Sequence, residues 1–394
     1  MRIEKIEARQ ILDSRKQSTI QISVLTEEGK FISSAPSGKS RGRFEAKPYL
    51  KSLNEDIKFI NNLRRKELSN LRIEEFKSLS EVEGLINNAI GANSLFALEA
   101  SILKALATEQ NKELWEFLSR NKNPKFPIPV GNVIGGGLHT KTTAGKKPDF
   151  QEFLIIPRAK RFVDNVFLMK KAHEEIGKIL ELRKVKGKPN DENAWSTSLD
   201  NENCLEILEK VRELLEGSAG EDIELGMDIA ASTFSKNNCY IYENKKQKLN
   251  RDGQINYISD LADKYELFYI EDPLEENDFD GFSELRGKTS AMVVGDDLTV
   301  TNMTRLKKAL QSRSINAIIV KPNQNGSLLK VKEICDFCQD KEIKIVFSHR
   351  SGETLDTTIA DLALAWKADF IKTGILGKER EAKLNRLIEI EKSL

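Results

Sequence analysis

The sequence predicts an α/β protein whose larger, C-terminal part is a (β/α) barrel. Short apolar runs recur after residue 129, and helical stretches such as 303–312 and 328–341 lie between them. This alternation indicates parallel βαβ units, and active sites of such barrels lie at the C-terminal ends of the strands. Each run ends in a polar residue that is able to do chemistry, at steps of 43, 25, 25, 28 and 23 residues: Asp228, Glu271, Asp296, Lys321, His349 and Lys372.

The N-terminal part reads as strands followed by helices. Residues 3–12, 19–25 and 31–35 alternate apolar and polar side chains, as strands with one buried face do. Residues 51–120 have helical spacing, and the clearest helix is 93–108, with Asn93 as its expected N-cap. Three prolines fall within residues 121–129, which suggests a boundary there. We therefore expect an α+β domain over residues 1–125 and a catalytic barrel over 126–394.

Composition argues against several classes of function. The 62 basic residues offset 61 acidic ones, so no global charge calls for nucleic acid or a membrane surface as a partner. No segment approaches the roughly 18 apolar residues of a membrane span. The first ten residues mix charge and apolar side chains, unlike a signal peptide. With only four cysteines, the chain is expected to be cytoplasmic with free thiols.

The acids at three successive strand ends predict a metal site. The carboxylates of Asp228, Glu271 and Asp296 could converge on one hard cation, for which Mg²⁺ is the best candidate. Alternatively, each acid is an ordinary strand-end residue in a salt bridge. Lys321 follows them, and a lysine beside a dication should have a lowered pKa and act as a general base. Its alternative is a structural lysine paired with one of the acids.

Other motifs carry weaker signals. His349, Arg350 and Ser351 offer donors for a phosphate or carboxylate at one strand end. Cys335 and Cys338 form a CxxC within an expected helix, for which plain core or surface cysteines are the default and a zinc or redox role the alternative. The glycines at 135–137 indicate a tight turn, since the Lys-Ser/Thr of a P-loop is missing. His173 is expected to be structural.

Ordered stretches along nearly the whole chain resemble the enolase family. They include PSGKSRG (36–42), LGMDIAAS (225–232), GDDLTVTN (295–302) and SHRSGET (348–354). The resemblance implies an enolase-type (β/α)8 barrel with irregular first units, capped by the N-terminal α+β domain. It also implies a lyase of glycolysis that uses two Mg²⁺ per active site and acts on a small phosphorylated acid. Homodimers or octamers are expected from the same resemblance.

The resemblance further implies roles for individual residues. Lys321 matches the base that takes the proton from C2. Glu192 matches the acid that helps the C3 hydroxyl to leave, and Glu152 its acidic partner. Asp228, Glu271 and Asp296 match the ligands of the first magnesium, and Ser40 the loop serine that reaches the second. The remaining matches are His139 in a mobile loop, His349, Arg350 and Ser351 for phosphate, and Lys372 for the substrate carboxylate.

The loop around Ser40 departs from the family pattern. Lys39, Arg41 and Arg43 stand where the family usually has small, uncharged residues. These cations are either drift on an exposed loop or a sign of a substrate with an additional anionic group. The alternatives to an enolase acting on 2-phospho-D-glycerate are therefore a paralogue acting on a related phospho or phosphono hydroxy acid, and a non-catalytic enolase-like binding protein.

Overall fold

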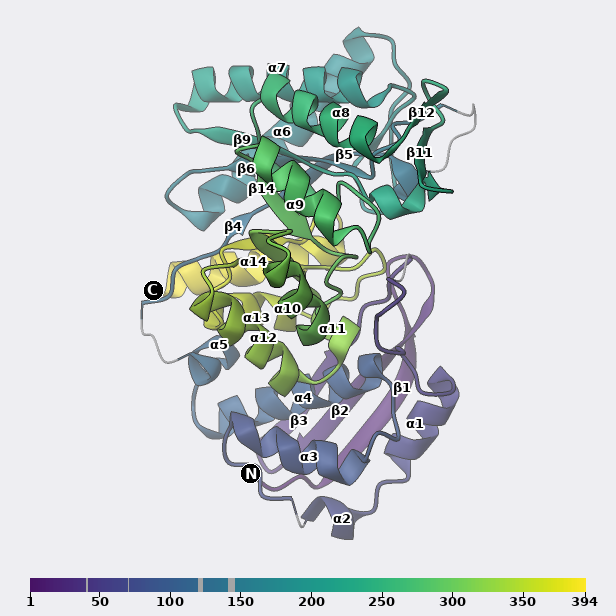
Figure 1. Ribbon diagram of the computed structural model, residues 1–394. Coiled ribbons are helices and arrows are strands. Elements are labelled where there is room, and N and C mark those ends of the chain that lie inside the picture. Colours follow the sequence, from purple (N-terminus) through teal and green to yellow (C-terminus); the bar gives the residue numbers. More distant parts are fainter. Residues whose placement is uncertain (40–41, 70, 120–122, 141–145) are drawn as a thin grey trace.

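A computed structural model of the chain describes residues 1–39, 42–69, 71–119, 123–140 and 146–394. An N-terminal antiparallel sheet with its helices lies below a larger α/β barrel (Figure 1). Among the described residues, no helix has both the length and the apolar character needed to cross a bilayer.

The N-terminal sheet has the order β1-β2-β3 and is antiparallel throughout. Its strands are β1 (Lys5–Leu12), β2 (Ser18–Thr26) and β3 (Gly29–Ser34), each within two residues of the expected bounds. Ile20, Ile22 and Val24 of β2 are fully buried, since they face the helices. These helices are α1 (Leu53–Asn61), α2 (Arg65–Ser69), η1 (Phe76–Ser78), α3 (Leu79–Ile86), α4 (Ala92–Glu109) and α5 (Leu114–Leu118).

Helix α4 lies across β2 and β3 and also contacts the barrel. The expected N-cap role of Asn93 is wrong, because the helix is capped by Gly91 and Asn93 is buried in its first turn. The Asn93 amide instead donates to the carbonyl oxygen of Pro36 at 3.2 Å, and its oxygen accepts from Asn323 Nδ2 at 2.9 Å. A polar side chain with partners in the tertiary structure no longer needs to cap the helix that carries it.

The large sheet closes into a barrel through one continuous segment, residues 128–135. Its start, β4 (Ile128–Pro129), pairs with β17, and its end, β5 (Gly131–Gly135), pairs with β6. Strand β6 is antiparallel to both of its neighbours, whereas the barrel strands β9, β13, β14, β15, β16 and β17 pair in parallel, so the first units are irregular as expected. The other barrel strands are β6 (Glu152–Pro157), β9 (Ile223–Asp228), β13 (Leu267–Glu271), β14 (Met292–Gly295), β15 (Ala317–Val320), β16 (Lys344–Ser348) and β17 (Phe370–Lys372).

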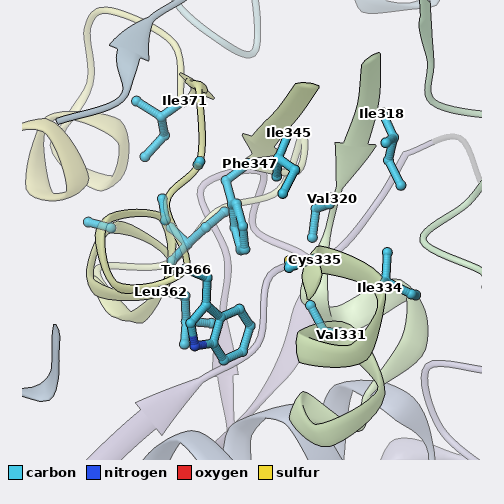
Figure 2. Close-up of a cluster of buried hydrophobic side chains, with 14 of the residues drawn as sticks. Ile318, Val320, Val331, Ile334, Cys335, Ile345, Phe347, Leu362, Trp366 and Ile371 are labelled. Carbon is cyan, nitrogen blue, oxygen red and sulfur yellow. The ribbon is translucent and has the colours of Figure 1, made fainter. Parts of the chain in front are cut away.

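Alternate residues of the barrel strands pack into two separate apolar clusters. Ala317 and Ile319 of β15 face the barrel interior, where they join side chains such as Tyr269 and Val346. Ile318 and Val320 point the other way, toward the surrounding helices (Figure 2). Because successive side chains of a strand point to opposite faces, a fully apolar run fills both layers.

The outer layer is made of helices whose bounds agree with the helical periodicity. The expected helices 303–312 and 328–341 are α10 (Met303–Gln311) and α12 (Leu328–Asp340). Cys335 and Cys338 lie buried on α12 with free thiols, and Cys335 faces the strands (Figure 2). The other helices are α6 (Phe162–Leu182), α7 (Asn201–Ala219), α8 (Arg251–Lys264), α9 (Phe279–Lys288), α11 (Pro322–Asn325), α13 (Thr358–Ala365) and α14 (Lys378–Ser393).

Short elements complete the connections between barrel strands. The glycine run expected as a turn leads from β5 into the short helix η2 (Gly137–His139), and Gly137 has a positive φ of 45°. His173 stacks on Trp195 and contacts the carbonyl oxygen of Asn193, in keeping with the expected structural role. The remaining elements are β7 (Lys188–Pro189), β8 (Trp195–Ser196), η3 (Ala231–Thr233), β10 (Ser235–Lys236), β11 (Cys239–Tyr242) and β12 (Gln247–Leu249).

Replacing Phe347 by alanine tests the outer apolar layer. Phe347 of β16 is fully buried, and its ring centroid lies 6.1 Å from that of Trp366. The Phe347→Ala substitution should lower the free energy of unfolding by about 3–5 kcal/mol, because it leaves a cavity that the layer cannot refill. Urea unfolding measures this, with Leu182→Ala, at a side chain 81% exposed, as the control. A loss below about 1 kcal/mol would contradict the packing described here.

Candidate active site

A polar cavity lies at the C-terminal ends of the barrel strands, between the barrel and the segment that follows β3. All six strand-end residues named from the sequence line it, although they come from six different strands or the loops after them. The lining also includes Gly38, Lys39, Glu45, His139, Gln151, Glu152, Glu192, Ala230, Thr233, Asp272, Asp297, Ser348, Arg350 and Ser351. The structure therefore brings the described candidates together in one place.

The ammonium group of Lys372 is the centre of the acidic wall. Its Nζ lies 2.7 Å from Glu271 Oε2 and 3.0 Å from both Asp228 Oδ2 and Glu152 Oε2. Burial alone would lower the pKa of Lys372, but the three carboxylates outweigh it and hold the pKa well above its usual value. Burial, with the nearby charge of Asp228, raises the pKa of Glu271 well above its usual value. The wall thus carries more carboxylates than the one cation can balance.

Lys321 contacts a different acid. Its Nζ forms a short ion pair with Asp296 Oδ2, at the ends of the neighbouring strands β15 and β14. The sequence led us to expect a lowered pKa for Lys321 beside a dication, and for the metal-bound site this stays a prediction. Burial does favour the neutral amine, but the adjacent Asp296 carboxylate outweighs burial and raises the pKa. The direction of the shift depends on what else engages Asp296.

Two further acids stand directly after the predicted ones. Asp272 follows Glu271, and its carboxylate accepts the backbone N–H groups of Asp296 at 3.0 Å and Asp297 at 2.6 Å. Asp272 thereby holds the turn that presents Asp296. Burial and the charge of Asp296 raise the pKa of Asp297 to about 7. Sequence reasoning named neither residue, although the acidic pairs in IEDP and GDDL were a visible signal.

The donor set fits a hard divalent cation. Asp296 Oδ1 is buried and has no hydrogen-bond partner among the described residues, so it is available as a ligand. Asp272, Asp296 and Asp297 place carboxylate oxygens within 4.8 Å of one another. In the described part of the chain, Asp228 and Glu271 do not form such a group with Asp296, because both carboxylates are drawn to Lys372. The site holds more carboxylates than cationic side chains, and carboxylate oxygens are ligands that Mg²⁺ prefers.

A second group of titratable side chains lies across the cavity. His139 Nδ1 is 3.4 Å from Glu152 Oε1 and 3.6 Å from Glu192 Oε1. Burial opposes a charged imidazole, but the two carboxylates outweigh burial and raise the pKa of His139. His349 Nε2 lies 3.7 Å from Glu192 Oε2. Burial and the nearby Arg380 guanidinium lower the pKa of His349 well below its usual value. Although both histidines lie beside Glu192, His139 therefore favours the protonated imidazolium and His349 the neutral imidazole.

The anion-binding candidates form the remaining wall. Arg350 Nη2 contacts Glu45 Oε2 at 3.0 Å. Ser351 Oγ accepts the backbone N–H of Lys39 at 2.7 Å, and Lys39 Nζ pairs with Asp191 at 3.4 Å.

The predicted residues of the basic loop are only partly placed. Ser40 and Arg41 lie outside the described residues. Lys39 lines the cavity, whereas Arg43 is exposed. Of the three added cations, Lys39 is thus the one that the structure places at the site.

Sequence reasoning also missed Glu45 and Gln151. Gln151 Nε2 donates to Asp228 Oδ2 at 3.2 Å and so adds a neutral donor to the acidic wall. Its position one residue before Glu152, in the stretch FQEF (150–153), was the available signal. Glu45 follows a loop of basic residues and carries no such signal, because its partners are distant in sequence.

Comparisons with known proteins cover the whole chain. Residues 3–118 match the family model described as "Enolase, N-terminal domain", and residues 123–394 match "Enolase, C-terminal TIM barrel domain". A protein named "Enolase" from Methanosphaera stadtmanae is 38% identical, covering 100% of this chain and 97% of the relative. "Enolase" proteins from Natronomonas pharaonis and Archaeoglobus fulgidus are 38% and 36% identical, each covering 99% of this chain.

The raised pKa of Asp297 predicts a pH dependence of stability in metal-free protein. Its pKa is 3.8 when unperturbed and about 7 when folded, so the folded state binds more protons over this window. The free energy of unfolding in a chelator should therefore fall as pH rises from about 4 to 7. Asp297→Asn should raise it by about 1–2 kcal/mol near pH 8 and much less near pH 5, since Asp297 is only partly buried.

Denaturant unfolding at the two pH values measures this difference. Asp260→Asn, at an exposed aspartate of α8, is the matched control and should change neither value. An equal effect of Asp297→Asn at both pH values would show that the Asp297 carboxyl is not the group responsible.

Proposed function

The chain belongs to the enolase family, and we propose that it is the lyase that converts 2-phospho-D-glycerate to phosphoenolpyruvate and water in glycolysis and gluconeogenesis. One observation carries the proposal. A single buried cavity holds a lysine beside one carboxylate, a second lysine among three carboxylates, and an arginine from a third strand end. Such a site can bind a doubly anionic acid and remove a proton from the carbon next to its carboxylate.

Asp228, Glu271 and Asp296 would hold the first of two Mg²⁺ ions, for which Asp228 and Glu271 would have to turn from Lys372, and Ser40 would reach the second. When bound, these ions supply positive charge that stabilises the second negative charge on the substrate carboxylate. Lys372 is proposed to bind the substrate carboxylate as well. Its ammonium group is buried among three acids and could turn from them toward that carboxylate.

Lys321 is proposed to take the proton from C2. Only the neutral amine can accept a proton at Nζ, and the contact with Asp296 favours the ammonium form. With the Asp296 carboxylate engaged as a ligand, that stabilisation would fall, and burial would favour the amine. The protonation state of Lys321 would therefore depend on whether the Asp296 carboxylate is bound to a cation.

Glu192 is proposed to give a proton to the C3 hydroxyl as it leaves. His139 lies between Glu192 and Glu152 and can hold a proton at Nδ1 for either carboxylate. His349, Arg350 and Ser351 are proposed to bind the phosphate. The low pKa of His349 keeps it neutral and able to donate one hydrogen bond, so Arg350 would carry the charge there.

We propose two domains, with residues 1–125 as the domain that caps the site and residues 126–394 as the catalytic barrel. The two family models, which end at 118 and begin at 123, support this boundary. Cytoplasmic residence is part of the proposal, in keeping with four free cysteines and the glycolytic substrate.

Replacing Lys321 tests the proposed activity. Purified protein with Mg²⁺ and 2-phospho-D-glycerate should produce the ultraviolet absorbance of the enol double bond. Lys321→Ala should reduce kcat by about 10²–10⁴-fold or more, because the general base is lost. Lys341→Ala, at an exposed lysine after α12, is the matched control and should keep full activity.

Three outcomes separate this function from its rivals. Removal of Mg²⁺ by a chelator should abolish turnover, and added Mg²⁺ should restore it. Without turnover, Mg²⁺-dependent exchange of an α-proton on a related phospho or phosphono acid would favour the paralogue. Failure to bind Mg²⁺ would leave the non-catalytic binding protein.

A homodimer, or an octamer built from such dimers, is proposed through one surface hollow in which exposed apolar side chains lie among polar ones. Leu12 and Leu355 are 61% and 65% exposed, and with Ile11 and Ile32 they line one surface hollow between the N-terminal sheet and the barrel. Exposed apolar side chains that gather from two parts of a chain are typical of protein interfaces.

Charged substitutions on this surface should separate the subunits. Wild-type protein should scatter light as twice the chain mass of 44.6 kDa or a multiple of it. The double variant Leu12→Asp, Leu355→Asp should shift to the mass of one chain, because it buries like charges in the contact. Leu182→Asp, at the exposed end of α6, should leave the mass unchanged. A monomeric wild type would refute this proposal.

A further inference from the structure

Glu45 is a buried acid of the cavity wall to which the proposed chemistry gives no task. It comes from the N-terminal part of the chain, yet its side chain is only 8% exposed. Its carboxylate accepts Arg350 Nη2 at 3.1 and 3.0 Å, Gln324 Nε2 at 3.2 Å and the backbone N–H of Gly42 at 2.9 Å. One carboxylate thus gathers donors from the barrel and from its own loop.

The contact with Arg350 controls how the guanidinium can turn. Both oxygens of Glu45 share the same nitrogen, Nη2, while Nη1 lies 3.5 Å from Asn323 Oδ1. The backbone N–H of Arg350 donates to Glu353 at 3.0 Å, which fixes the base of the side chain. A guanidinium is planar, so anchoring one terminal nitrogen against a carboxylate sets the plane in which it meets an anion.

A chain of hydrogen bonds joins Glu45 to the backbone of Lys321. Gln324, which donates to Glu45, accepts from Thr301 Oγ1 at 2.8 Å, and Thr301 Oγ1 accepts the backbone N–H of Lys321 at 2.9 Å. Val300 and Thr301 have positive φ values of 45° and 49°, which β-branched residues rarely adopt. The strained turn is held where its hydroxyl reaches the strand end that carries Lys321.

We propose that Glu45 is a positioning residue that acts through Arg350. It orients the guanidinium for the phosphate of the substrate and ties that arginine to the strand end that carries the base. This inference rests on the proposed function, because it takes Arg350 as a phosphate ligand. By its charge alone, a carboxylate close to an anion site would weaken anion binding. Glu45 is therefore expected to help by orienting Arg350, and the direction in which KM changes when its charge is removed tells the two effects apart.

The Glu45→Gln substitution tests this role because glutamine keeps the shape and one acceptor but loses the charge. The KM for 2-phospho-D-glycerate should rise about 10- to 100-fold, the range for loss of a charge-assisted hydrogen bond. The kcat should change much less, since phosphate binding is shared by the ground and transition states. The inhibition constant of inorganic phosphate should rise in parallel with KM, which a merely structural role would not produce.

A double-mutant cycle with Arg350→Lys identifies the route of the effect. If Glu45 acts through Arg350, adding Glu45→Gln to Arg350→Lys should raise KM by less than about twofold further. Independent, multiplicative effects would overturn the proposal. Glu55→Gln, the same change at an exposed glutamate of α1, is the control and should match wild type.

The wild-type assay separates this inference from the proposed function. No turnover by wild type refutes the function itself, whereas active wild type with an unchanged or lower KM in Glu45→Gln refutes only the role of Glu45. Glu45→Asp, which keeps the charge on a shorter side chain, should also raise KM and serves if the glutamine variant does not fold. Loss of folding in both variants would assign Glu45 to stability and overturn the proposal.

Discussion

The acidic mouth of the barrel depends on one buried ammonium group, that of Lys372. Its three carboxylate partners come from β6, β9 and β13, whereas Lys372 is the last residue of β17. In the sheet, β14, β15 and β16 separate β17 from β13, and the segment 128–135 separates it from β6. Buried carboxylates without a counter-charge would cost several kcal/mol each. The single cation lets them approach, but it leaves the wall short of positive charge, which is the condition that favours a bound divalent cation.

The position of Lys372 in turn depends on barrel closure. The segment 128–135 pairs with β17 at its start and with β6 at its end, so it joins the two edges of the curved sheet. Hydrogen bonds from Ile128 and Val130 to the β17 region, at 2.9 and 2.8 Å, make that junction regular. With the sheet closed, strand ends that are far apart in sequence face one cavity, and an ammonium from the last strand reaches acids of the first ones.

The N-terminal part completes the site by touching the loops of the barrel mouth. Ser37 and Gly352 exchange backbone hydrogen bonds of 2.7 and 2.8 Å. A Cβ at Gly352 would lie 2.1 Å from Asp13 Oδ2 and 2.5 Å from Ser37 Oγ, so a larger residue there would have to displace these two side chains. Asn93 and Glu45 add contacts to Asn323 and Arg350. The side chains around the anion site are therefore supported from both parts of the molecule.

The sequence by itself determined the barrel, the N-terminal sheet and six strand-end residues, because period-two and helical patterns are local and parallel strands present their C-terminal ends on one face. It also pointed to carboxylates as metal ligands. Only the tertiary structure decided which groups touch: that Lys372 binds Asp228 and Glu271, that Lys321 has a raised pKa beside Asp296, and that Asn93 bridges to the barrel instead of capping its helix. Glu45 escaped sequence reasoning for the same reason, whereas Asp272 and Asp297 directly follow predicted acids and left a local signal. Burial and charge pairing depend on distances across the closed barrel and between its two parts, and no local pattern encodes those distances.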